Sequence, residues 1–224
     1  MKVIAYDSAK VTILFPFEEV SPIGGQDGLV IINKTADRYN FVRGPDLNIS
    51  RQERDKIGLR FETGSSKIND ELISIGEFTI HGDGVVIVAK TTIEAEIFWD
   101  DLVKWMRLEN HFRDFTVTPV RRFISQIVVE FSVPLSTIIP IYSALANAVS
   151  AKLSEIYDAP IPINFSGLDM SFDKVGSKSA MIVPDFKIER RAGIAFDRER
   201  YYCSAPLRTS DHVEILELIE RYLV

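Results

Sequence analysis

An alternating apolar run that leads directly into a long helical pattern lies between Phe123 and Tyr157 and sharply limits the possible folds. From Ile127 to Val133 every second residue is apolar, which is typical of a half-buried strand. After Pro134, apolar residues recur at steps of three and four, as one face of an α-helix requires: Ile138, Ile141, Leu145, Val149, Leu153 and Ile156. The pattern predicts a central strand and a helix over about 138–157 whose apolar face lies in the core.

Two further helices are indicated by capping signals and apolar periodicity. Thr91 and Glu94 have the spacing of a capping box at the start of a helix over about 91–109. Asp211 and Glu214 have the same spacing before the apolar residues of a final helix over about 211–223. The sequence therefore predicts three long helices, spread over the middle and the end of the chain.

Most of the remaining chain has the composition of short strands. Ile73–Ile80 and Val85–Ala89 flank a turn that contains Gly82 and Gly84, which is the clearest hairpin of the sequence. Further strands are predicted at Val3–Tyr6, Val11–Phe17, Leu29–Asn33, Tyr39–Val42, 161–173, 179–188, 193–196 and 201–205. The glycine-rich loop at 21–28 precedes a predicted strand, so we interpret it as a connection without a phosphate-binding role.

Runs of strands with helices grouped after them predict an α+β fold. In this fold, antiparallel sheet carries the helices at about 91–109, 138–157 and 211–223 on one face. We expect a single domain over 1–224, with sub-halves 1–115 and 116–224. The similar order of elements in these two β-rich halves leaves an internal duplication open, although no residue pattern repeats at a fixed offset.

Composition limits the compartment and the partners. The single cysteine, Cys203, excludes an intrachain disulfide and a cysteine-based zinc site, and it indicates a reducing, cytoplasmic location. The most apolar window, 133–149, contains two prolines and is too short to span a bilayer, so we expect no membrane association. The net charge of −6 gives no general attraction to nucleic acid.

Catalytic signatures are missing from the sequence. Cys203 lies in a predicted strand, where a thiol is more often a small buried hydrophobe than a nucleophile. The carboxylates of the helix at 91–109 point to several sides and do not converge on a metal ion. We therefore expect no metal site and no cofactor.

A local group of cations is found at 187–200, and it consists of Lys187, Arg190, Arg191, Arg198 and Arg200. Glu189, Asp197 and Glu199 are interleaved with these side chains and weaken their joint positive field. Weak nucleic-acid binding through this basic region is thus a third hypothesis for function.

The side of the central helix opposite its apolar face carries small polar residues, namely Ser143, Asn147, Ser150 and Ser154. Only Lys152 and Glu155 are charged between Pro140 and Tyr157, fewer than a helix facing bulk water normally carries. We expect this side to be covered by the C-terminal helix or by a symmetry-related helix of a homodimer.

These observations favour a non-catalytic cytoplasmic protein that acts by protein–protein interaction, including self-association. The alternative is an enzyme or small-ligand-binding protein with a pocket between the sheet and the central helix. A protein partner or a homo-oligomer is expected, and nucleic acid is not the favoured partner.

Overall fold

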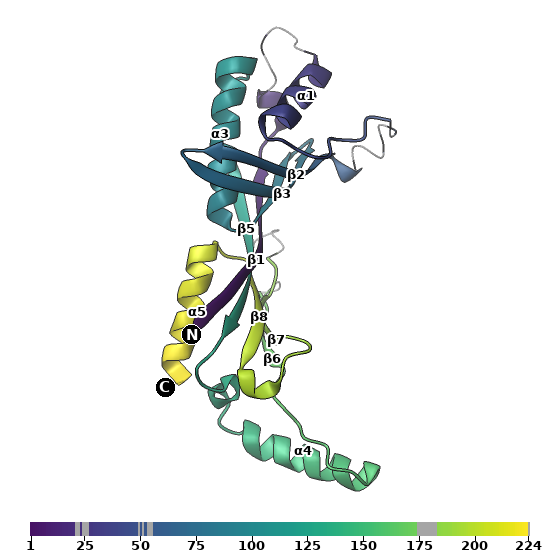
Figure 1. Ribbon diagram of the computed structural model, residues 1–224, viewed down its shortest axis with the longest axis vertical. Helices are drawn as coiled ribbons and strands as arrows, with labels where there is room; N and C mark the ends of the chain where they lie inside the picture. Colours follow the sequence, from purple (N-terminus) through teal and green to yellow (C-terminus); the bar gives the residue numbers. More distant parts are fainter. Residues whose placement is uncertain are drawn as a thin grey trace. The chain divides into compact units, whose positions relative to one another are not determined.

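The computed structural model describes residues 1–20, 23, 27–48, 50, 52, 56–173 and 183–223, and it has an α+β fold (Figure 1). Its strands are β1 (Lys2–Leu14), β2 (Leu59–Ile68), β3 (Glu71–His81), β4 (Gly84–Ala89), β5 (Val120–Glu130), β6 (Gly167–Met170), β7 (Phe186–Arg190) and β8 (Arg200–Ala205). They form an antiparallel sheet in the order β2-β3-β4-β1-β5-β8-β7-β6. The predicted fold class is confirmed.

Four α-helices are present in the described part of the chain: α1 (Gly28–Arg38), α3 (Thr92–Asn110), α4 (Tyr142–Tyr157) and α5 (Thr209–Leu223). Three short 3₁₀ helices, η1 (Phe17–Val20), η2 (Leu135–Ile138) and η3 (Phe196–Arg198), lie in connections. No described helix has the length and apolar content that crossing a membrane requires.

The chain divides into two compact units. The N-terminal unit comprises 8–125 and 207–209, and the C-terminal unit comprises 1–7, 126–206 and 210–224. Along β5 the change from one unit to the other falls between Ser125 and Gln126, further along the chain than the predicted seam between 115 and 116.

The core of the N-terminal unit lies between α3 and the sheet strands β2, β3, β4 and the second part of β1. Buried residues alternate along these strands, and the register places Phe61 opposite Phe78 and Phe78 opposite Ile87. Phe98 of α3 meets the Phe78 ring at 5.3 Å and the Tyr39 ring at 4.7 Å. One layer of helix therefore covers one face of the sheet, as an amphipathic helix requires.

Helix α3 begins and ends as the sequence predicts. The Thr91 side chain accepts a hydrogen bond from the backbone N–H of Glu94, which satisfies a donor that has no partner within the helix. At the other end His111 takes a left-handed conformation with φ 53°, and its N–H bonds to Met106.

The predicted strand at Leu29–Asn33 is wrong, because this segment lies within α1. Asp27 caps the helix by accepting a hydrogen bond from Leu29 N–H, and Ile32, Thr35 and Ala36 face the core at helical spacing. The β-branched run Val30-Ile31-Ile32 misled the prediction, since tertiary packing overrides local propensity. Residues 21, 22 and 24–26 of the glycine-rich loop lie outside the described residues.

Other boundaries also differ from the sequence prediction. The sequence predicts two strands at Val3–Tyr6 and Val11–Phe17. In the structure β1 runs unbroken from Lys2 to Leu14, because no glycine or proline interrupts it and Ala9 already pairs with Ala89. Of the predicted strand at 193–196, only Phe196 belongs to a regular element, η3.

The C-terminal unit contains β6, β7, β8, α4 and α5. Ile188 of β7 and Cys203 of β8 are paired in register and fully buried, and Leu216 and His212 of α5 are buried as well. Glu220 pairs with the amino group of Met1, and α5 lies beside the first part of β1 in Figure 1. Helix α5 starts at Thr209, so Asp211 lies in its first turn and is not its cap.

Candidate interaction surface

Helix α4 forms because its sequence is rich in good helix formers, among them Ala144, Ala146, Ala148 and Ala151. Pro134, η2 and Pro140 precede it, and the helix itself runs from Tyr142 to Tyr157. Asp158 ends it in a left-handed conformation with φ 49°, and its N–H bonds to the Ser154 carbonyl. The helix is therefore shorter at its start than the predicted 138–157.

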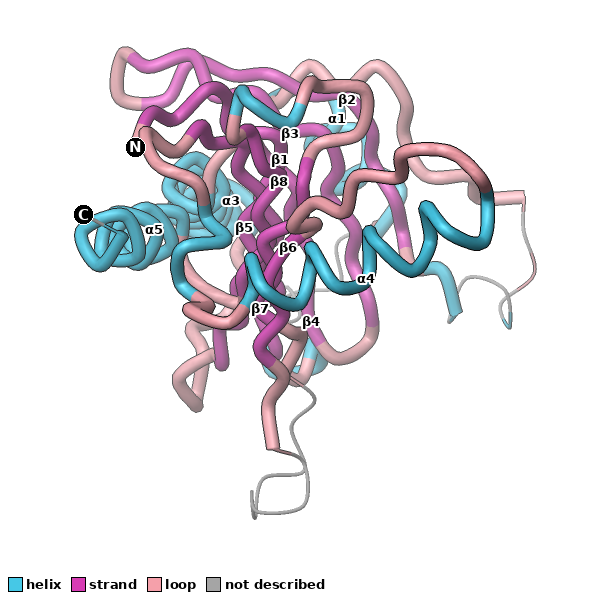
Figure 2. The backbone as a smooth tube through the Cα atoms, turned by 90° about the horizontal axis from the view of Figure 1, so that it is seen from below, coloured by secondary structure: helices cyan, strands magenta, loops and turns pink. Residues whose placement is uncertain are grey.

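One side of α4 contacts the extended segment that follows it, which runs alongside the helix in Figure 2. The Ser150 hydroxyl donates to the carbonyl of Ile161, and the N–H of Ile161 donates to the Ser154 hydroxyl at 3.0 Å. The Tyr142 ring packs edge-on against Phe165, with 5.3 Å between ring centroids. Ala146 is the buried residue of this side.

The four polar residues identified in the sequence thus fall into two pairs that differ in burial and bonding. Ser150 and Ser154 are half-buried and bonded to the chain's own segment around Ile161, whereas Ser143 and Asn147 are exposed. The contacts that cover this side come from the residues after α4, and the sequence prediction had assigned them to the C-terminal helix or to a second copy. A role for these four residues in binding a partner stays a prediction.

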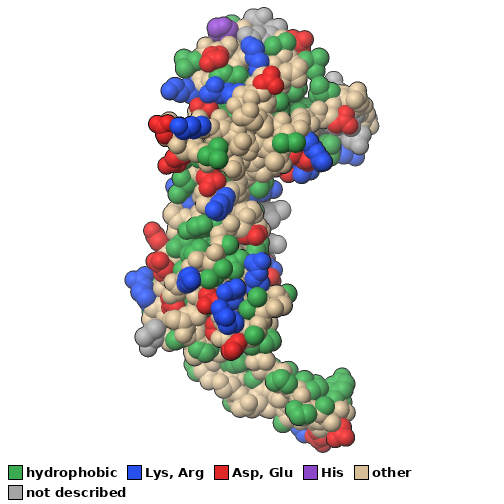
Figure 3. All heavy atoms as spheres, viewed as in Figure 1, with side chains coloured by type: hydrophobic (Ala, Val, Ile, Leu, Met, Phe, Trp, Pro, Cys, Tyr) green, Lys and Arg blue, Asp and Glu red, His purple; other side chains and the backbone are tan. Residues whose placement is uncertain are grey.

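The apolar face of α4 is where sequence and structure disagree. Four residues, which we call the apolar stripe, expose large fractions of their surface: Ile141 69%, Leu145 59%, Val149 39% and Ile156 72%. Ile138 and Tyr157 at its ends are also exposed, and hydrophobic side chains gather over α4 in Figure 3. The prediction that this face lies in the core is wrong, because the fold places the covering segment along the neighbouring side.

Charge is scarce on this helix. Lys152 and Glu155 are its charged residues, and they pair with each other at 3.3 Å. An amphipathic helix on a solvated surface normally opposes its apolar stripe with charged residues. Because α4 combines an exposed apolar stripe with so little charge, it is the strongest candidate for a surface that another molecule covers.

The basic region at 187–200 is largely neutralised by carboxylates. Arg198 and Arg200 both pair with Glu130, at 3.7 and 2.8 Å, and the Arg200 hydrogen bond lowers the pKa of that carboxyl. Lys187 lies 3.9 Å from Asp169. Arg191 is exposed, and the ion pairs of the described residues do not include it. Few cations remain for a phosphate backbone.

Arg190 has a structural role within this region. Its side chain is 10% exposed and donates to Glu199, to the Tyr201 hydroxyl and to the carbonyls of Phe165 and Phe196. Burial and the hydrogen bond to Glu199 raise the pKa of Tyr201, which keeps the phenol protonated. This network ties β7 to the segments around it, so Arg190 is not available to a ligand.

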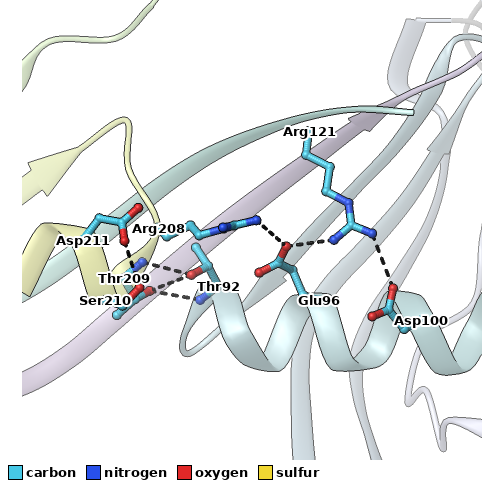
Figure 4. Close-up of polar contacts among 8 residues, drawn as sticks. All are labelled: Thr92, Glu96, Asp100, Arg121, Arg208, Thr209, Ser210 and Asp211. Carbon is cyan, nitrogen blue, oxygen red and sulfur yellow. Dashed lines mark hydrogen bonds and ion pairs between the residues drawn. The ribbon is translucent and has the colours of Figure 1, made fainter. Parts of the chain in front are cut away.

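Two carboxylates of α3, Glu96 and Asp100, share Arg121 as an ion-pair partner (Figure 4). Glu96 pairs with Arg121 at 2.8 Å and with Arg208 at 3.3 Å, while Asp100 receives a second contact from Arg121 at 3.4 Å. Asp101 instead accepts from the Tyr39 hydroxyl at 2.7 Å and from Arg38. Within the described residues, no group of three or more histidine, cysteine or acidic residues is arranged to hold a metal ion.

Cysteine and histidine are often used in covalent and acid–base catalysis, and Cys203 and His212 are both buried. Cys203 is fully buried, as predicted, and burial raises the pKa of its thiol to about 12, so the thiolate is scarce at neutral pH. His212 is buried beside Phe186, and desolvation lowers its pKa to about 4. His81 ends β3, as the hairpin predicts.

Searches against family models and against curated protein sequences return no match for this chain. The function is therefore argued from its own geometry.

Proposed function

We propose that this protein is a non-catalytic cytoplasmic binding protein that self-associates, with α4 of one copy packed antiparallel on α4 of a second. The observation that carries the proposal is the apolar stripe, since four large aliphatic side chains lie exposed on one helix with a single internally paired charge couple. Burying such side chains contributes up to about 1.5–3 kcal/mol each.

The spacing of the apolar residues favours a second copy over an unrelated partner. Leu145 and Val149 lie two residues on either side of Asn147, Ile141 and Leu153 lie six, and Ile138 and Ile156 lie nine. In a two-fold interface, residue i of one copy contacts residue j of the other and the reverse. An antiparallel pair centred at the level of Asn147 therefore places Leu145 opposite Val149, and Ile141 at the helix start opposite Leu153. Ile138 lies in η2, outside α4, so this register does not place it opposite Ile156.

Charge is compatible with the same arrangement. In that register Lys152 lies opposite Tyr142 of the second copy, and Glu155 lies beyond the start of the second copy's α4. No like charges face each other, so pairing costs little electrostatic repulsion. The contact is limited to one helix and its flanks, so we expect it to be smaller than a standard interface and the dimer to be concentration-dependent.

Light scattering across a concentration series tests the proposal. The wild-type mass should rise from one chain towards two as protein concentration increases. Leu145→Glu should keep the protein monomeric, because it introduces a charge into the centre of the apolar interface. The matched control is Ala151→Glu, which adds the same charge at an exposed position of α4 outside the stripe and should dimerise like wild type.

Cross-linking distinguishes two-fold pairing from other contacts. Leu145→Cys and Val149→Cys chains, when mixed under mild oxidation, should form disulfide dimers faster than either chain alone, since positions 145 and 149 face each other between copies. The buried Cys203 does not compete in the reaction. A wild-type protein that stays monomeric at every concentration, or a Leu145→Glu variant that still dimerises, would refute the proposal.

A further inference from the structure

An apolar cavity lies inside the N-terminal unit. Its volume is about 80 Å³, and it is enclosed by α1, α3, the sheet and the segment at 112–115. Phe61 and Phe78 of the sheet and Trp99 of α3 form walls, and Ile32 closes the α1 side. This cavity differs from the pocket that the sequence suggested, which was expected between the sheet and the central helix.

The cavity interior has almost no polar group that could form a hydrogen bond with a water molecule. The Thr35 hydroxyl reaches the lining but donates to the carbonyl of Ile31 in its own helix at 2.8 Å. A buried water is stable only with about two to four polar partners, and an apolar cavity without them stays dry. The space is therefore suited to hydrocarbon.

One end of the cavity is different, because its lining includes the cations Arg107 and Arg113. Arg107 lies 2.9 Å from Asp114, and its guanidinium lies 5.6 Å from the centre of the Phe115 ring. Arg113 is exposed, and among the described residues no ion pair involves it. The neighbouring Phe112 and Phe115 are half-buried, so this end opens towards solvent.

From this arrangement we infer that the cavity binds a free aliphatic carboxylate of short or medium chain length. The end of the chain occupies the apolar interior, and the carboxylate lies at the open end beside Arg113. The cavity has roughly half the ~150 Å³ of an apolar cavity that holds benzene, so it takes a few methylene groups and the rest of the chain lies in the mouth.

Binding of sodium octanoate, measured by calorimetry and by tryptophan fluorescence below its micellar concentration, tests this inference. Trp99 lies in the cavity wall and is one of two tryptophans, so its emission should change on binding. 1-Octanol is the neutral comparison ligand. Octanoate should bind more tightly than octanol and should raise the melting temperature, because it binds the native state.

Two variants test separately how the aliphatic chain and the carboxylate of octanoate contribute to binding. Ile32→Phe fills the cavity and should weaken octanoate binding at least tenfold, whereas Leu29→Phe, at an exposed position of the same helix, should leave binding unchanged. Arg113→Gln should weaken octanoate binding by up to about fivefold, the range of an exposed ion pair, and should spare octanol. The control for charge is Arg122→Gln, an exposed arginine outside the cavity lining.

Melting curves of all four variants show that each remains folded before its binding is compared. Absence of octanoate binding, or unchanged binding in Ile32→Phe, would overturn the inference. Equal affinity for octanoate and octanol, with no effect of Arg113→Gln, would overturn the assignment of a carboxylate ligand. These measurements are made at protein concentrations low enough to keep the chain monomeric. Their outcome therefore does not depend on whether α4 forms dimers.

Discussion

The two longest described helices, α3 and α4, show how differently one chain can use an amphipathic pattern. Helix α3 carries seven charged residues and buries Ala95, Phe98, Trp99, Leu102 and Trp105 against the sheet. Helix α4 carries two charged residues and buries Ala146 alone. Both have apolar residues at helical spacing, so this spacing identifies a face that must be covered but not the element that covers it.

The comparison predicts a large difference between two truncations. Phe98→Ala should reduce the free energy of unfolding by about 3–5 kcal/mol, because Phe98 is fully buried among Tyr39, Phe41 and Phe78. Leu145→Ala should cost less than about 1 kcal/mol in dilute solution, since Leu145 is mostly exposed. Denaturant titration at low protein concentration measures both values. Similar losses would mean that α4 packs on its own chain in solution.

Helix α5 belongs with α3 in this comparison, because it buries His212 and Leu216. The unfolded chain binds a proton at His212 below about pH 6.5, whereas the folded protein resists protonation until about pH 4. The contribution of the buried neutral imidazole is therefore fully present above pH 6.5 and is lost as the pH falls towards 4. Between pH 7.5 and 5 the loss should be about 2 kcal/mol.

His212→Phe should remove this part of the acid sensitivity, which denaturant titrations at the two pH values measure. His111→Asn is the control, because His111 is exposed and asparagine tolerates its left-handed conformation. If both variants lose stability with acid as steeply as wild type, His212 is not held neutral in the folded protein.

The smallest effect is expected on the charged side of α3. Glu96→Gln removes the carboxylate that Arg121 and Arg208 share, but those arginines are one-third to one-half exposed, so the loss should be about 0.2–1 kcal/mol. The difference from wild type should shrink in 1 M salt, where surface charges are screened. A larger, salt-independent loss in thermal unfolding would show that this network is part of the packed structure.

Much of the fold could be predicted from local patterns. The Thr91–Glu94 spacing located the start of α3, and the glycines at 82 and 84 located the β3–β4 turn, because caps and tight turns depend on residues close in sequence. The strand predicted at Leu29–Asn33 is wrong because local residues do not decide this segment's structure. Its β-branched residues favour a strand locally, but the cap at Asp27 and the packing of Ile32 and Thr35 produce a helix.

The candidate surfaces were less predictable. The sequence identified α4 as unusual through its low charge, yet it placed the apolar stripe in the core and the serine side at an interface. Ser150 and Ser154 form hydrogen bonds with Ile161 because the chain turns back along α4 after the helix ends. A periodic sequence pattern does not predict such a turn. The cavity was missed too, since its walls come from α1, α3 and several strands.

By itself the sequence determined where apolar residues recur with the period of a helix or of a strand, because 3.6- and 2-residue periodicities are properties of neighbouring residues. It thereby determined the α+β class, the burial of Cys203 and the capping of α3. Tertiary structure alone decided that the face of α3 meets a sheet while the stripe of α4 stays exposed. That choice depends on contacts between distant segments, whose closeness in space is set by the whole fold.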